Sequence, residues 1–235
     1  MSITINKNES YRMFDRIARC YDFVNLFISL GMHQGWRKKM MLHLPACKDQ
    51  NVLDLATGTG DVAFTLARES RVAKVTGLDL STGMLTVAGK KAINDDLDQK
   101  VRFIEGDAQH IPAKSQSYDA ITISFGIRNV PNTSKCLADA LRVLKPSGKM
   151  IILESALPRS RILRFFSLIH VRYVLPVLGW LLSGDPYAYR YLDKTIRTYP
   201  HGKDFLAMMV GVGFKNTGFQ SLALGGVNLY WGEKQ

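Results

Sequence analysis

Residues 52–63, VLDLATGTGDVA, carry the clearest structural pattern in the chain. An apolar run typical of a buried strand contains Asp54, and a turn with Gly58 and Gly60 then leads into a helix-compatible segment. Glycines let the backbone approach a bound molecule closely because no Cβ intervenes. The helix that follows directs free N–H groups at that molecule. The stretch therefore predicts a strand–turn–helix unit that binds a nucleoside-containing cofactor.

Strand-like runs alternate with helical patterns through the middle of the chain. The runs cover residues 51–56, 73–80, 100–107, 118–125 and 148–155, and the helical patterns lie near 60–69, 82–91 and 133–144. Such alternation indicates βαβ units. After a further helix near 202–212, two strand-like runs flank Gly225 and Gly226 and predict a hairpin. We expect an α/β fold, a Rossmann-like sheet of about seven strands, mostly parallel with an antiparallel C-terminal hairpin and helices on both faces.

The sequence predicts a single domain over residues 1–235, in which the segments before and after the core cover it. We expect a helical N-terminal cap (1–45), a cofactor-binding core (46–156), an apolar helical insert (157–199) and a final helix with the last strand pair (200–235). Residues 162–182 are mostly apolar but include Arg164 and Arg172. Two arginines inside a membrane span would cost roughly 5–7 kcal/mol. This segment is therefore a pocket lid, a buried helix pair or a helix lying on a membrane surface.

Composition restricts the partners and the cellular setting. The net charge of +11 implies attraction to an anionic partner, either nucleic acid or an anionic membrane, unless it marks only a solvated basic surface. Three cysteines without a CxxC pair, and five histidines without ligand spacing, predict neither a disulfide framework nor a metal site. The polar N-terminus does not resemble a signal peptide. We expect a cytoplasmic protein.

The glycine turn by itself fits two cofactors. Gly58-Thr59-Gly60-Asp61-Val62-Ala63 matches the dinucleotide pattern GxGxxG/A, and Asp79 follows at the distance expected of a ribose-binding acid. An NAD-dependent oxidoreductase is therefore one interpretation of the turn.

The wider pattern resembles the class I S-adenosylmethionine-dependent methyltransferases. The resemblance is carried by DLATGTG, LDLS, EGDA, SYDAITISF and RVLKPSG, in this order between residues 51 and 155. It implies S-adenosyl-L-methionine as cofactor, with these binding residues: Asp54, Gly58, Thr59 and Gly60 for the methionine end, Asp79 for the ribose, and Asp107 and Ala108 for the adenine. Ser124 ends the fourth strand and either faces the cofactor or satisfies a backbone group.

Three further motifs resemble a narrower family, the quinone-biosynthesis C-methyltransferases. The motifs are YDFVNLFISLGMHQGWRKK (21–39), SFGIRNV (124–130) and YLDKTIRTYP (191–200). The resemblance implies C-methylation of a polyprenyl quinol, most directly demethylmenaquinol, or the methoxybenzoquinol of ubiquinone synthesis. The apolar insert and the aromatic N-terminal segment suit the prenyl tail, and the basic charge suits an anionic membrane surface.

Three residues are candidates for the chemistry. Arg128 stays protonated, so it would stabilise a phenolate or polarise a water that carries a proton away. Asn129 would orient the other hydroxyl of the quinol. His33 has the ordinary pKa of a general base. The alternatives are a surface arginine, a turn asparagine and a structural histidine.

Other functions remain open from the sequence. They are a methyltransferase acting on RNA or another small molecule, the oxidoreductase, and a non-enzymatic lipid-binding module. No target-base motif of the Asn/Asp-Pro-Pro-Tyr type is present, which disfavours RNA. We expect transient association with an anionic membrane surface, and we also consider a homo-oligomer.

Overall fold

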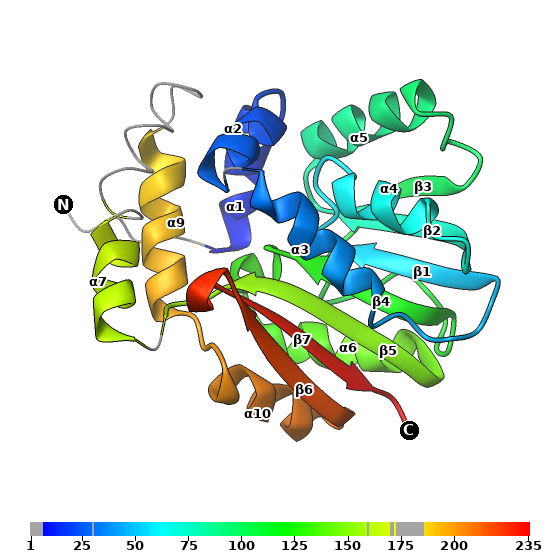
Figure 1. Cartoon of the computed structure of the whole chain (residues 1–235). Helices are drawn as coiled ribbons and strands as arrows, with labels where there is room; N and C mark the ends of the chain where they lie inside the picture. The colour runs from blue at the N-terminus through cyan, green and yellow to red at the C-terminus, as the bar shows by residue number, and fades with distance from the viewer. Residues whose placement is uncertain (1–6, 30, 159, 170–171, 173–185) are drawn as a thin grey trace.

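The computed structural model describes residues 7–29, 31–158, 160–169, 172 and 186–235. Its centre is a seven-stranded sheet with the order β3-β2-β1-β4-β5-β7-β6 (Figure 1). The strands are β1 (Gln50–Leu55), β2 (Val72–Asp79), β3 (Val101–Glu105), β4 (Tyr118–Ser124), β5 (Leu144–Ser155), β6 (Lys215–Leu222) and β7 (Val227–Glu233). β1 to β5 are parallel, and β7 runs antiparallel between β5 and β6. The predicted fold class is confirmed.

The helices pack on this sheet, as βαβ connections require. Those of the core are α4 (Asp61–Ala67), α5 (Thr82–Asn94), α6 (Thr133–Val143) and α10 (Lys203–Val212). One apolar cluster lies under α6 and α10, and another lies under α4 and α3 (Met32–Met41), so both faces of the sheet are buried. Ser81 caps α5 by accepting a hydrogen bond from the Met84 N–H at 3.1 Å.

The start of β5 differs from the prediction. The strand begins at Leu144 rather than near residue 148, and its register with β4 shifts between the pairs Tyr118–Leu144 and Ala120–Lys149. Ser147 has φ of 61° within this irregular stretch. Residues 144–147, which lie before the predicted strand, are therefore part of a longer strand that contains a bulge.

The N-terminal segment forms a helical cap over one end of the sheet. After a short 3-10 helix, η1 (Lys7–Glu9), it comprises α1 (Ser10–Ile17), α2 (Tyr21–Ile28) and α3 (Met32–Met41). In Figure 1, α1 and α2 lie between the core and the helix α9 (Pro186–Thr198), with α7 (Arg161–Ile169) beyond. A small apolar cluster joins α1, α7 and α9, so these flanks close over one site.

The insert is described only in part. Residues 170–171 and 173–185 lie outside the described residues, so the prediction for 162–182 can be followed only through α7 and Arg172. Among the described helices, none is both long enough and apolar enough to span a bilayer.

Candidate active site

Two adjoining cavities lie at the carboxyl edge of the sheet, where β1 and β4 are neighbours and the strand order reverses. Ligands of open α/β sheets bind in this crevice. The larger cavity has a volume of about 250 Å³ and the smaller about 150 Å³. The residues that line both are Tyr21, Ala56, Gly58, Ser124 and Phe125. A molecule in one cavity can therefore meet a molecule in the other.

The turn after β1 needs the unusual backbone that its glycines allow. Ala56, Gly58 and Gly60 all have positive φ, at 48°, 56° and 87°. The loop after β4 approaches closely, since a Cβ on Gly126 would lie 2.5 Å from the Cβ of Ala56. Glycine at 126 is therefore required where the two loops meet.

The smaller cavity collects the residues predicted to hold the nucleoside. It is lined by Asp79, Asp107, Ala108, Ser124 and Asn129. Asp79 accepts backbone hydrogen bonds from Gly58 at 2.8 Å and Ser81 at 2.9 Å. Burial raises the pKa of Asp79, while these N–H groups oppose that shift.

Two side-chain atoms in this cavity fit a polar ligand. Ser124 Oγ and Asn129 Oδ1 are buried and have no hydrogen-bond partner within the described part of the chain. Buried polar atoms are normally satisfied, so unpaired atoms in residues that line a cavity fit a ligand with polar groups. The nucleoside portion of S-adenosylmethionine would supply such groups. The structure thus places Asn129 with the predicted nucleoside-binding residues, apart from Arg128, which lines only the larger cavity.

Asp54 is buried at the junction of β1 and β4 and lines the larger cavity. It accepts hydrogen bonds from the hydroxyls of Thr57 and Thr122, both at 2.6 Å. Burial raises the pKa of Asp54 to about 6, despite these bonds. Two threonine hydroxyls thus satisfy this buried carboxylate.

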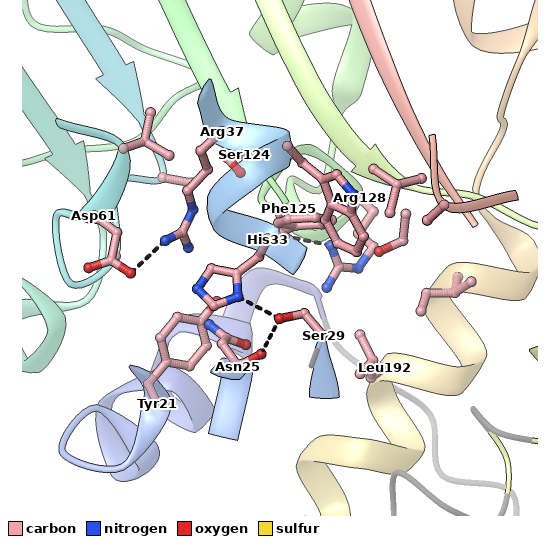
Figure 2. Close-up of a pocket in the computed structure, with 18 of the residues that line it drawn as sticks. Tyr21, Asn25, Ser29, His33, Arg37, Asp61, Ser124, Phe125, Arg128 and Leu192 are labelled. Carbon is pink, nitrogen blue, oxygen red and sulfur yellow. Dashed lines mark hydrogen bonds and ion pairs between the residues drawn. The ribbon is translucent and has the colours of Figure 1, made fainter. Parts of the chain in front are cut away.

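Arg128 follows β4 in the short helix η2 (Ile127–Asn129) and is buried. Its Nη1 donates to Glu154 Oε1 at 2.5 Å and to the carbonyl oxygen of Phe125 at 2.6 Å. Its Nε has no partner within the described residues. Figure 2 shows the guanidinium on the wall of the larger cavity, across from His33. It is therefore a fixed hydrogen-bond donor whose charge is balanced by a carboxylate.

His33 lies on α3 and is largely buried beside the same cavity. Its Nδ1 lies 2.5 Å from Ser29 Oγ. Burial lowers the pKa of His33, the neighbouring Arg37 lowers it further, and Asp61 and Asp22 oppose the shift. The imidazole is therefore neutral at pH 7, as a proton acceptor must be.

A charged network joins the cap to the core. Lys91 on α5 binds Asp61 and also binds Asp22 of the cap at 2.8 Å, and Arg37 binds Asp61 at 2.6 Å. Asp22 accepts a further bond from Thr59 Oγ1 at 2.5 Å. The predicted cofactor residue Thr59 thus uses its hydroxyl to hold the cap.

A second carboxylate fastens the cap at the other end of α5. Asp15 Oδ1 accepts hydrogen bonds from Ser81 Oγ at 2.5 Å and from the Gly83 N–H at 2.9 Å. Between the two attachments, Tyr11, Phe14 and Tyr21 of the cap line the smaller cavity. The cap therefore roofs the smaller cavity.

Comparison with known proteins shows the family to which the chain belongs. A profile described as the ubiE/COQ5 methyltransferase family matches residues 3–234. The chain belongs to this family. It is an S-adenosylmethionine-dependent methyltransferase, so the oxidoreductase interpretation of the glycine turn is wrong.

Individual relatives cover most of the chain. It is 40% identical over 213 residues to a ubiquinone/menaquinone biosynthesis C-methyltransferase UbiE of Bartonella henselae, covering 89% of this chain and 82% of the relative. It is 37% identical to a demethylmenaquinone methyltransferase of Bacteroides fragilis, covering 95% and 91%. Among solved structures, a SAM-dependent methyltransferase of Thermotoga maritima matches with a TM-score of 0.68 at 17% identity, covering 96% of this chain and all of its own.

Sequence reasoning missed several residues of the methyltransferase site. Glu154, the partner of Arg128, is the one acid in the apolar strand run MIILES, the same signal that identified Asp54. No pattern in the sequence indicates the network of Arg37, Asp61 and Lys91, because these residues lie on three helices that only the tertiary fold brings together.

Asp54 makes the stability of the ligand-free methyltransferase depend on pH. Its pKa of about 6 in the folded state exceeds the ordinary 3.8, so the folded protein binds more protons between these values. The free energy of unfolding should therefore fall by up to about 3 kcal/mol as the pH rises through this window. Urea unfolding at pH 4 to 7 measures it. Asp54→Asn should lack this component; an unchanged profile in that variant would contradict the assignment.

Lys91→Met should loosen the cap. The variant leaves Asp22 and Asp61 without their shared cation, so we expect cofactor affinity to fall about fivefold, equivalent to about 1 kcal/mol. Calorimetric titration with S-adenosylmethionine measures the change. Lys90→Met, at an exposed position of the same helix, is the matched control and should bind normally. Equal affinities in the two variants would show that the network does not hold the roof of the cavity.

Proposed function

We propose that this methyltransferase C-methylates the ring of a polyprenyl quinol, most directly demethylmenaquinol, with the benzoquinol of ubiquinone synthesis as a second substrate. The observation that carries the proposal is the family match over nearly the whole chain, which includes the cap and the segment 191–200. The Bartonella and Bacteroides relatives are named for these reactions. A cavity suited to an aromatic ring adjoins the cofactor cavity.

The larger cavity combines apolar walls with a few polar groups. Its apolar walls include Trp36, Val62, Phe125, Leu192 and Ile196. Trp36 and Phe125 lie with ring centroids 6.2 Å apart, which gives the cavity an aromatic side. Apolar cavities with a few placed polar groups orient small molecules. An uncharged ring with two hydroxyls and a prenyl tail has this distribution of polarity.

The reaction needs an electron-rich ring, because S-adenosylmethionine supplies an electrophilic methyl group when it is bound. The reduced quinol becomes such a nucleophile when one hydroxyl loses its proton and charge moves to the neighbouring ring carbon. With the cofactor bound, a carbon–carbon bond would form as the methyl–sulfur bond breaks. The methylated ring carbon would then lose its hydrogen as a proton while the phenolic oxygen regains one, so that one proton is released overall. Arg128 would donate to the developing phenolate oxygen, and His33 would accept the proton.

The function is tested by labelled methyl transfer to reduced demethylmenaquinone and to the benzoquinol analogue, assayed in parallel. The double variant Arg128→Gln/Glu154→Gln removes the donor charge without stranding a buried carboxylate. It should bind the cofactor normally and turn over about 100-fold more slowly.

Asp79→Asn is the companion variant and should instead lose cofactor affinity. Transfer to RNA but to neither quinol would overturn the proposal. Unchanged turnover in the double variant would remove Arg128 from the mechanism.

We also propose that the protein docks on an anionic membrane surface through α7. Ile162, Phe165 and Ile169 recur at helical spacing and are exposed by 70%, 61% and 38%. Arg161 and Arg164 are exposed on the same helix. Apolar side chains flanked by arginines are typical of helices that lie at a lipid interface. Ser167 of this helix also lines the substrate cavity, so a prenyl tail would have a short path from the lipid.

Vesicle sedimentation tests this docking. The protein should pellet with vesicles containing phosphatidylglycerol and much less with phosphatidylcholine alone, and high salt should weaken the binding. Ile162→Ser/Phe165→Ser should reduce binding about tenfold. Ile93→Ser, at an exposed position of α5, is the control and should bind normally. Equal binding by both variants would place the contact elsewhere.

A further inference from the structure

Ser29 connects the catalytic histidine to the backbone of the cap. Its hydroxyl donates to the carbonyl oxygen of Asn25 at 2.7 Å and lies 2.5 Å from His33 Nδ1 (Figure 2). Both Ser29 and His33 are more than nine-tenths buried, and both line the larger cavity. A serine that bonds back one turn is common near the end of a helix. Here the same oxygen also meets an imidazole.

The two contacts of Ser29 determine which imidazole nitrogen carries the proton. A carbonyl oxygen can only accept, so the single hydroxyl proton of Ser29 points to Asn25. Ser29 Oγ must then accept from His33, and Nδ1 must be the protonated nitrogen. A neutral imidazole has one N–H, so the lone pair that accepts a proton is on Nε2. No hydrogen bond ties Nε2 to another of the described residues.

We propose that Ser29 is a positioning residue that holds His33 as the Nδ1–H tautomer, so that Nε2 accepts the proton from the quinol hydroxyl. This inference rests on the proposed function. In the step, the oxygen–hydrogen bond of the quinol breaks, its electron pair stays on the oxygen, and the proton bonds to Nε2. The imidazolium that forms keeps its Nδ1–H bond to Ser29. The same serine therefore supports the ring before and after the transfer.

The charged groups around His33 favour the neutral starting state. Arg37 is one turn away on α3 and disfavours a second positive charge, while Asp61 on α4 and Asp22 on α2 partly compensate. Arg37 is itself held by Asp61, and the phenol of Tyr21 on α2 stays protonated because burial raises its pKa. The histidine thus enters the reaction uncharged, and tautomer choice decides which nitrogen is available.

Nitrogen-15 NMR of the uniformly labelled full-length protein tests the tautomer directly. At pH 8, His33 should show a protonated Nδ1 and an unprotonated Nε2, with its signals assigned by their absence in His33→Gln. Ser29→Ala should shift the ring toward the Nε2–H form, whereas Ser29→Thr should retain the wild-type tautomer. A protonated Nε2 in the wild type would overturn the inference whether or not any quinol is methylated.

Kinetics separate positioning from a general structural role. In Ser29→Ala, kcat should fall about tenfold, with the KM of the quinol and the binding of S-adenosylmethionine changed by less than about twofold. The acid limb of kcat should move to lower pH, since the imidazolium loses a charge-assisted acceptor. Ser29→Thr should keep the kcat and the acid limb of the wild type.

The outcomes distinguish this inference from the function on which it rests. A wild-type protein that methylates neither quinol would overturn the proposed function and leave the NMR result to decide the tautomer. An active wild type whose Ser29→Ala variant keeps its kcat and its acid limb would overturn the inference alone. If Ser29→Ala does not fold, the inference is tested by the tautomer of His33 in the wild type and by the activity of His33→Asn. His33→Asn keeps a donor near Ser29 but lacks Nε2, so it should be as inactive as His33→Gln.

Discussion

The site depends on the buried carboxylate of Asp54, which joins the two central strands where the strand order reverses. Asp54 and Thr122 are paired in the sheet register, and the carboxylate binds the hydroxyl of Thr122 on one oxygen and that of Thr57 on the other. An acid buried at a strand end is costly unless it is satisfied. By engaging Thr57, it also holds the residue that precedes Gly58 in the glycine turn. The turn and the segment at the end of β4 line both cavities.

The sequence predicted the core well because its signals are local. Strand–helix alternation, the glycine turn and the polar residues at strand ends each follow from a few adjacent residues. Of the predicted site residues, Asp79, Asp107 and Ser124 line one cavity. The predicted start of β5 was wrong because the strand extends back through a bulge to Leu144. The roles assigned to the site residues remain predictions. Their placement nevertheless separates Asn129 from Arg128, which adjacency in sequence could not reveal.

The cap was harder to predict because its attachments are tertiary. Its helices were expected, but nothing in residues 7–41 indicates that Asp15 and Asp22 bind opposite ends of α5. Helices as short as α1 and α2 are not stable alone, so their order derives from packing and from these two attachments. Because the cap contributes His33 to the larger cavity and Tyr11 and Phe14 to the smaller one, the attachments to α5 hold residues of both cavities.

Each arginine that lines the larger cavity is matched by a carboxylate, and this suits an uncharged substrate. Arg37 faces Asp61 and Arg128 faces Glu154, so a quinol entering the cavity meets hydrogen-bond donors without having to desolvate an unbalanced cation. A paired arginine still stabilises a phenolate, because its remaining N–H groups stay fixed as the negative charge develops. A neutral group suits the proton that is released, and His33, which we propose as its acceptor, is an imidazole of lowered pKa across the cavity from Arg128. Since both arginines of this cavity are matched by carboxylates, the excess cations behind the net charge of +11 lie outside these two pairs.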